Sequence, residues 1–228
     1  MAGLVRFRRR PARRTVFALA VAASTLLGGC AGGPGGASAP AVAVTRAPGA
    51  DRTALWAYAC PAVGTTVAHA APGAERRVVA VRQVVEVDRA DAAMCLVMDP
   101  ATGARRWLAY EVGGSDLAPA LRALLPAAPG DCAALRGLAA DSTGGQPYAF
   151  RVCLRGVEER DLPVGRRRAA VVTAEYESEA QGGWAGAWEF AYDIERRALV
   201  SRSFALRRGD PRPQAEWRAL RVEVRRPS

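Results

Sequence analysis

Two of the twenty amino acids are missing from this 228-residue chain, and two others are almost missing. It contains no Lys and no Asn, one His and one Ile, so all 32 basic residues are Arg. Without Lys there is no Walker A nucleotide loop, no Schiff base and no lysine general base. Metal sites built from His or Cys need several ligands at a defined spacing, and His69 has no such neighbours in the sequence. The sequence therefore predicts no cofactor, no metal site and no enzymatic activity.

The motifs of common hydrolases are absent or incomplete. No Gly-x-Ser-x-Gly elbow is present to provide a serine nucleophile. Residues 141–144 (Asp-Ser-Thr-Gly) resemble an aspartic-protease motif, but the motif is one residue too long and has no second copy, so we expect a loop. Glu175, Glu177 and Glu179 should form the solvated face of a strand rather than a calcium or paired-acid site. A hydrolase that pairs His69 with a Ser or an acid is the remaining enzymatic alternative.

The net charge of +10 is concentrated near the N-terminus. Six Arg fall within the first 14 residues, and the first acid is Asp51. Without residues 1–29 the chain has 26 Arg against 22 acids, a net charge of +4. The remaining Arg are interleaved with Asp and Glu, whereas a nucleic-acid-binding domain usually keeps a basic patch. We therefore expect no nucleic-acid partner.

The first 29 residues have the pattern of an export signal. An Arg-rich stretch precedes the apolar run 15–27, which small residues follow. This order is typical of a secretory signal peptide. The run is too short for a membrane-spanning helix, which needs about 20 residues. Residues 1–29 are thus predicted to be a signal peptide.

The end of the apolar run carries a more specific motif. Leu27-Gly28-Gly29-Cys30 resembles the lipobox of bacterial lipoproteins, and the resemblance covers only the first 30 residues. It implies cleavage between Gly29 and Cys30, a diacylglyceryl group on the Cys30 thiol and an acyl chain such as palmitate on the new amine. In that family Asp after the Cys retains the protein in the inner membrane, so Ala31 favours the outer membrane. An ordinary signal peptide with a chance Cys is the alternative.

Residues 31–50 separate this Cys from the folded part. They are largely Ala, Gly and Pro, and Arg46 is their only charge. Such a segment has little apolar surface to bury and should form a flexible tether that spans on the order of 25 Å. Residues 51–228 are then expected to form the periplasm-facing domain, with two subdomains that divide near residue 128 as the alternative.

Period-2 alternation dominates this domain and predicts strands. In residues 147–155, Tyr148, Phe150 and Val152 face one way and polar side chains face the other. Similar patterns predict strands at 79–88, 94–99, 105–112, 170–177, 188–193 and 220–225. Two segments should be hairpin turns, namely residues 99–103 and 193–197.

Helix is scarce. Ser115 can cap a helix that Pro126 ends, and four leucines share its apolar face: Leu117, Leu121, Leu124 and Leu125. Residues 131–136 are expected to add one helical turn. The predicted fold is mainly β, an antiparallel β-sandwich or a partly open β-barrel with one or two short helices.

One strand carries a stripe of three aromatic residues. Trp188, Phe190 and Tyr192 alternate with Glu189, Ala191 and Asp193, so the three rings should share a face. We expect this face to point into the core, and a pocket for an apolar ligand is the alternative.

Four cysteines remain if Cys30 is acylated, and an exported protein is expected to oxidise them. We predict the pairs Cys60–Cys95 and Cys132–Cys153, because each pair lies on its own side of residue 128. Cys95 and Cys153 alternate with apolar neighbours and should lie on the less buried face of a strand, where a covering segment can reach them. The rival pairing joins Cys95 to Cys153 and Cys60 to Cys132.

The sequence as a whole predicts an outer-membrane lipoprotein whose β-domain binds or braces something without catalysis. Its partners would be the membrane, through the acyl chains on Cys30, and an envelope protein or an apolar ligand. A half-barrel carrier of acyl chains is the main alternative. A core filled by side chains would favour the binding of a partner, whereas a hollow core would favour the carrier.

Overall fold

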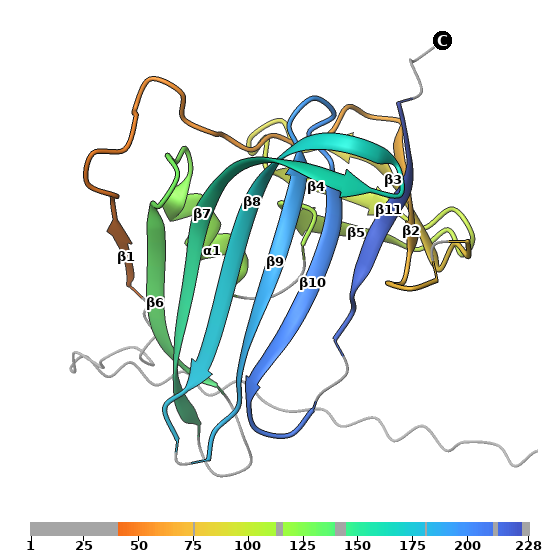
Figure 1. The fold of residues 1–228 in the computed structure, drawn as a ribbon. Coiled ribbons are helices and arrows are strands. Elements are labelled where there is room, and N and C mark those ends of the chain that lie inside the picture. The colour runs from red at the N-terminus through yellow and green to blue at the C-terminus, as the bar shows by residue number, and fades with distance from the viewer. Residues whose placement is uncertain are drawn as a thin grey trace, which may run out of the picture. The chain divides into compact units, whose positions relative to one another are not determined.

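The computed structural model describes residues 41–74, 76–112, 116–139, 145–180, 182–211 and 214–224. Within these ranges the chain forms eleven strands and one helix (Figure 1). The strands are β1 (Val42–Thr45), β2 (Thr65–Ala70), β3 (Ala80–Val87), β4 (Met94–Met98), β5 (Arg105–Ala109), β6 (Cys132–Ala139), β7 (Gln146–Leu162), β8 (Gly165–Ser178), β9 (Ala185–Asp193), β10 (Leu199–Arg208) and β11 (Trp217–Val224), and the helix is α1 (Leu117–Leu124). The signal peptide, Gly29, Cys30, Ser115 and residues 141–144 lie outside the described ranges.

All eleven strands belong to one antiparallel sheet. Their order is β1-β6-β7-β8-β9-β10-β11-β2-β3-β4-β5, and the two outer strands do not pair with each other. Strands from both sides of residue 128 share the sheet, because β11 pairs with β2 and β1 pairs with β6. Figure 1 shows the sheet curving around α1. The predicted mainly β, antiparallel fold with a short helix is confirmed, and the sheet is open.

Both predicted hairpins are present. Residues 99–103 join β4 to β5, and Gly103 has the positive φ of 71° that such a tight turn favours. Residues 193–197 join β9 to β10, with backbone N–H groups of the turn donating to the Asp193 carboxylate.

Two sequence predictions on the N-terminal side of the sheet were wrong. Residues 131–136, predicted as a helical turn, instead lead into and begin β6, which starts at Cys132, because eight residue pairs with β7 outweigh the helix propensity of an Ala-rich segment. Residues 42–45, predicted to belong to the flexible tether, form β1 and pair with β6 over Val42–Thr45. The edge of β6 needs backbone partners, and this short segment supplies them.

The main core lies between α1 and the inner face of the curved sheet. Leu117, Ala120, Leu121 and Leu124 of α1 are buried, and they pack with buried side chains of β6, β7, β8 and β9. The helix ends at Leu125, before Pro126, as predicted, and its N-cap position is Asp116. Among the described residues, no helix is long and apolar enough to cross a membrane.

A second, smaller core lies on the outer face of the sheet. β7 and β8 are the longest strands, and the β7–β8 hairpin bends over β9 and β10 toward β11 (Figure 1). Buried and partly buried residues of the hairpin and of the strands beneath it meet there: Leu162, Val164, Ala169, Ala191, Val200, Val67 and Ala219. This cover buries Ala191 and Asp193, which alternate with the aromatic stripe of β9 and are each 1% exposed.

Candidate functional site

Both predicted disulfides are present. Cys60 bonds to Cys95 with a Cα–Cα distance of 5.9 Å, and Cys132 bonds to Cys153. The pairing is confirmed, but part of its reasoning was wrong. Cys95 is fully buried rather than on an exposed face, and Cys132 lies directly opposite Cys153 in the neighbouring strand rather than on a covering segment. Cys60 does come from a covering segment, residues 46–64 between β1 and β2, which we call the strap.

The single histidine is buried in the core. His69 is 2% exposed, and its ring centroid lies 4.0 Å from that of Trp217. Burial, together with the nearby Arg82 guanidinium, lowers the pKa of His69 to about 3. Its Nε2 has no hydrogen-bond partner in the structure. His69 is therefore a neutral core side chain in this fold.

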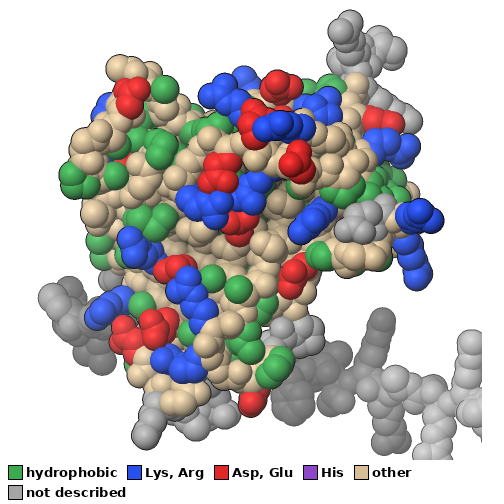
Figure 2. Space-filling view, in the orientation of Figure 1, with side chains coloured by type: hydrophobic (Ala, Val, Ile, Leu, Met, Phe, Trp, Pro, Cys, Tyr) green, Lys and Arg blue, Asp and Glu red, His purple; other side chains and the backbone are tan. Residues whose placement is uncertain are grey.

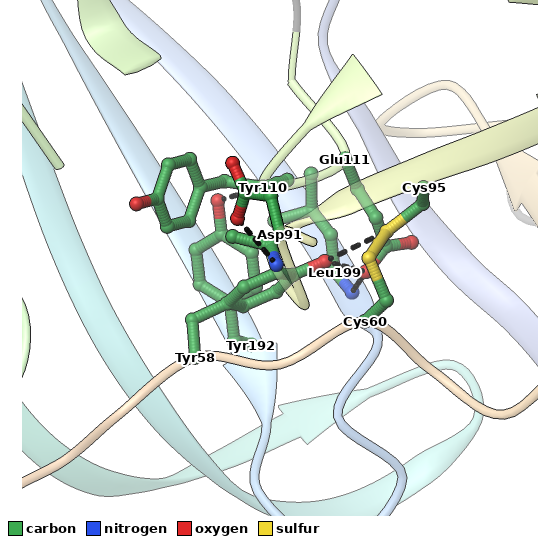
Figure 3. The surroundings of a disulfide bond; sticks show 9 residues. Tyr58, Cys60, Asp91, Cys95, Tyr110, Glu111, Tyr192 and Leu199 are labelled. Atoms are coloured by element: carbon green, nitrogen blue, oxygen red, sulfur yellow. Dashed lines mark hydrogen bonds between the residues drawn. A yellow bond between two sulfur atoms is a disulfide. The ribbon is translucent and has the colours of Figure 1, made fainter. Parts of the chain in front are cut away.

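A buried acid that the sequence analysis missed lies beside the first disulfide (Figure 3). Glu111 is 5% exposed, and its Oε1 accepts hydrogen bonds from the Leu199 N–H at 3.0 Å and the Tyr58 hydroxyl at 3.3 Å. Burial raises the pKa of Glu111 to about 7, against the lowering effect of these donors and of Arg82. Tyr110 and Glu111 both have left-handed backbone, with φ of 55° and 57°. The carboxyl group thus links the strap to β10.

A second buried acid fixes the other end of the strap. Asp131 is fully buried, and its carboxylate accepts hydrogen bonds from the Arg46 and Arg52 guanidiniums and from the backbone N–H groups of Ala47 and Ala128. The hydrogen bond from Arg52 is the largest of the effects that hold the pKa of Asp131 well below its usual value. We call this group the Asp131 clamp.

The three alternating glutamates lie on the outer face of the sheet, and each pairs with an arginine. The pairs are Glu175–Arg207, Glu177–Arg208 and Glu179–Arg136. Acidic and basic side chains are interspersed over this face (Figure 2). Within the described ranges no group of three His, Cys, Asp or Glu side chains is placed to hold a metal ion.

Aromatic side chains gather at one end of the inner face, the lower end in Figure 1. At this end β6, β8 and β10 finish and β7, β9 and β11 begin. The ring centroids follow one another at 5.1 to 5.7 Å in the series Tyr148, Tyr176, Trp184, Trp188 and Phe204. Tyr148 is buried and the other four are half-buried. We call these five residues the aromatic end.

Two glycines make room for these rings. A Cβ at Gly186 would lie 2.5 Å from the Phe204 ring and 2.7 Å from the Trp184 ring. A Cβ at Gly137 would lie 2.6 Å from the Tyr148 hydroxyl oxygen. Because these positions lack side chains, the rings can lie against the sheet. The Trp188 Nε1–H also donates to the Gln214 side chain at 3.3 Å, which fixes that indole.

The predicted aromatic stripe divides between the core and this site. Phe190 and Tyr192 are 3% and 2% exposed, and the Tyr192 hydroxyl donates to the Tyr110 carbonyl, so both are core residues as predicted. Trp188 is half-buried and belongs to the aromatic end. Sequence reasoning missed the other four rings; Phe204, for example, meets Trp188 only through the pairing of β9 with β10, and Trp184 lies just before β9, outside the alternating stretch.

The middle of the inner face is filled by α1, and the strap covers its opposite end with Trp56 and Tyr58. The aromatic end is therefore a shallow, partly exposed site rather than the mouth of a deep cavity. Its rings offer apolar contact area, and the described residues around it supply no nucleophile held by a base.

A scan against protein-family models and searches of the curated proteins and of the solved structures found no match to this chain.

Proposed function

We propose that this protein is a lipid-anchored component of the cell envelope whose β-domain binds an apolar group at the aromatic end, without catalysis. The observation that carries the proposal is the cluster of four half-buried rings around Trp188. Large aromatic side chains are normally buried, and a contiguous exposed apolar patch marks a binding surface.

The energetics favour a ligand with an apolar surface. Each 100 Å² of ring surface that a ligand covers contributes about 2.5 kcal/mol. The rings are already packed on one another, and Gln214 holds the Trp188 indole, so little side-chain freedom is lost on binding. An acyl chain and the apolar side chains of an envelope protein both have the required chemistry.

The packing of α1 on the inner face of the sheet bears on the alternative that the protein is a carrier of acyl chains. A carrier that encloses a whole acyl chain needs a cavity of a few hundred Å³ along the inner face. Here α1 occupies the middle of that face, with Leu121 and Leu124 at most 1% exposed. A hollow of about 320 Å³ lies at the strap end, where Trp56, Tyr58 and Tyr192 line it, and none of the five residues of the aromatic end lines this hollow. This packing supports binding at the surface of the aromatic end over enclosure.

The anchor is the second part of the proposal. The Leu27–Cys30 lipobox supports acylation of Cys30 and attachment to the outer membrane. One acyl chain binds a bilayer only marginally, whereas the two or more expected on Cys30 hold it stably. Mass spectrometry of the membrane fraction tests this. We expect an N-terminal Cys30 with a diacylglyceryl group and an amide-linked acyl chain, and a chain cut elsewhere and free of lipid would refute it.

Binding at the aromatic end can be tested with a dansyl-labelled fatty acid. Energy transfer from tryptophan should report binding to the full-length protein. Trp188→Ala removes a central ring and should weaken binding about tenfold, the loss expected for some 50 Å² or more of contact. Trp107→Ala is the matched control, because Trp107 is 44% exposed on β5 and lies outside the cluster. Equal binding by both variants would place the apolar site elsewhere.

A further inference from the structure

The structure fixes where the N-terminal segment joins the domain. In the pairing of β1 with β6, Val42 lies opposite Leu135. Leu135 precedes Gly137 by two residues, and Gly137 lies opposite Tyr148 of the aromatic end. Two residues of a strand span about 7 Å. The described chain therefore begins at the aromatic end of the sheet.

The Asp131 clamp holds this arrangement in place. Arg46 and Ala47, directly after β1, both bind Asp131 at the start of β6, so β1 is fixed to the sheet beyond its own backbone pairs. Only residues 31–41 then separate Cys30 from β1. For the Ala, Gly and Pro composition of these residues, the tether expected from the sequence would span about 18 Å on average, whereas the ten residues of β10 extend about 33 Å. An anchor at Cys30 would therefore hold the aromatic end closer to the bilayer than the opposite end of the domain.

The surface at this end has the composition of a membrane interface. Leu138, near the end of β6, is 72% exposed, and Leu206, opposite Gly186 in the pairing of β10 with β9, is 39% exposed. Both leucines lie at the end of the sheet that carries the half-buried rings of Trp184 and Trp188. Trp and Tyr are enriched where a protein meets lipid headgroups. Exposed Arg side chains follow at the same end, and Arg can extend its charge toward headgroups while its stem stays apolar. These arginines are Arg136, Arg207 and Arg208.

These three arginines are each paired with an acid. Glu175, Glu177 and Glu179 form ion pairs with them, so among the described residues this group adds no net positive charge that would attract anionic lipid. Contact with a bilayer would then depend on apolar insertion and change little with salt or with the charge of the lipid.

From these observations we infer that the aromatic end docks on the lipid bilayer itself, with Leu138, Leu206 and the Trp184–Trp188 pair in the headgroup region. The inference rests on the proposed function in one respect, since it takes Cys30 as the anchor. It names the bilayer as the partner that covers the aromatic end. The opposite end, with the strap and the Glu111 carboxyl group, then faces away from the membrane.

Quenching of tryptophan fluorescence by brominated phosphatidylcholine tests the orientation. The full-length protein is reconstituted into vesicles of this neutral lipid. We expect strong quenching that is retained by Trp56→Phe, because Trp56 lies in the strap, and that is mostly lost in a variant with Trp184→Phe and Trp188→Phe. Retained quenching in the double variant, or its loss in Trp56→Phe, would overturn the inference.

Substitutions of the exposed leucines test insertion into the bilayer without changing the tryptophan rings. Leu138→Asp and Leu206→Asp should each weaken partition into neutral vesicles about tenfold, with little effect of salt. Val63→Asp is the matched control, since Val63 is 51% exposed in the strap and should leave partition unchanged. Near-wild-type circular dichroism of each variant shows that the fold is kept.

These outcomes distinguish the inference from the proposed function. If Cys30 carries no lipid but the unanchored protein still binds vesicles through Trp184 and Trp188, the anchor fails and the docking surface stands. If the acylated protein shows no quenching of these two tryptophans, the docking surface fails and the anchor stands. If vesicle binding persists in Leu138→Asp and Leu206→Asp but needs anionic lipid, charge rather than apolar insertion holds the domain and the inference is wrong.

Discussion

At the scale of single residues, Glu111 and Asp131 show how surroundings decide the charge of a buried carboxyl group. Asp131 accepts hydrogen bonds from two guanidiniums and two backbone N–H groups, which stabilise its ionised form. Glu111 accepts from one N–H and one hydroxyl, and the neighbouring Arg82 donates to its backbone carbonyl instead. The pKa therefore falls for Asp131 and rises for Glu111.

Glu111 should make the protein less stable as the pH rises. Its pKa is about 7 in the folded protein against 4.5 as a free side chain, so the folded state binds its proton more tightly. The stabilisation that this proton provides is complete below about pH 4.5 and is lost as the pH rises to about 7, a change of roughly 3 kcal/mol. Glu111→Gln should remove most of this dependence. Urea unfolding of both proteins at pH 5 and pH 8 measures the difference, and parallel pH profiles would contradict the prediction.

Asp131→Asn tests the clamp. The variant keeps an acceptor but loses the charge that binds Arg46 and Arg52, so we expect the free energy of unfolding at pH 7 to fall by roughly 2–4 kcal/mol. Because the pKa of Asp131 is lowered by folding, this contribution is present above its ordinary pKa of 3.8 and disappears as the pH falls below it. Asp161→Asn, at an exposed position, is the control and should change stability little. Equal loss in both would exclude a specific role for the clamp.

At the scale of elements, the two disulfides close loops of similar size but connect different kinds of neighbours. Their sequence separations are 35 and 21 residues, for which chain entropy gives about 3–4 kcal/mol each. Cys132 and Cys153 join two strands that already share a ladder of hydrogen bonds. Cys60 instead joins the strap to β4, where the backbone bond from Cys60 to Ala92 is one of few links.

Removal of each disulfide should therefore have different local effects. Replacing both Cys60 and Cys95 by Ser should lower stability and speed hydrogen exchange throughout the strap, because Tyr58 and its neighbours lose their attachment. Replacing both Cys132 and Cys153 should lower stability by a similar amount but leave exchange in the strap unchanged. Exchange followed by mass spectrometry distinguishes them, and an unaffected strap in the first variant would refute this difference.

The contact of β9 with the rings of the aromatic end predicts the effect of one added methyl group. Gly186→Ala should displace the Phe204 and Trp184 rings, cost about 1–3 kcal/mol and change the near-ultraviolet circular dichroism of the tryptophans. Gly156→Ala is a matched control in β7, because no atom lies within 4 Å of its added Cβ. A Gly186→Ala variant as stable as Gly156→Ala would show that the rings are not held against the sheet.

At the scale of the whole molecule, the sequence predicts local order well and distant pairing poorly. Alternation along single strands, as in Tyr148–Leu154, gave the β class, most strands and both hairpins, because side-chain direction follows from period 2 alone. The Ala-rich β6 was predicted wrongly because its pairing with β7, not its propensity, decides its conformation. The pairing of β11 with β2 leaves no local signal at all, since Val222 and Val67 lie opposite each other from distant parts of the chain.

The same limit applies to the candidate site. Trp188 was found from its alternation, whereas Phe204 joins it only through the register of β9 and β10, and Trp184 lies before β9, outside the alternating stretch. The sequence did not predict that Glu111 is buried, because a single acid beside apolar residues is typical of the exposed end of a strand. The sequence thus singled out Trp188 as a candidate site residue but not Trp184 or Phe204, and it did not indicate that Glu111 or Asp131 is buried.

The pairing of β11 with β2 also sets the order in which the fold can be completed. A chain is synthesised from its N-terminus, so β2 emerges early and its partner β11, residues 217–224, emerges after the ten other described strands. Until then β2 and β10 each present an unpaired edge, and such edges readily pair with other chains. Contacts between segments so distant in sequence also form slowly. The newly made protein therefore passes through a stage in which the edges of β2 and β10 stay open to other chains until β11 pairs with both.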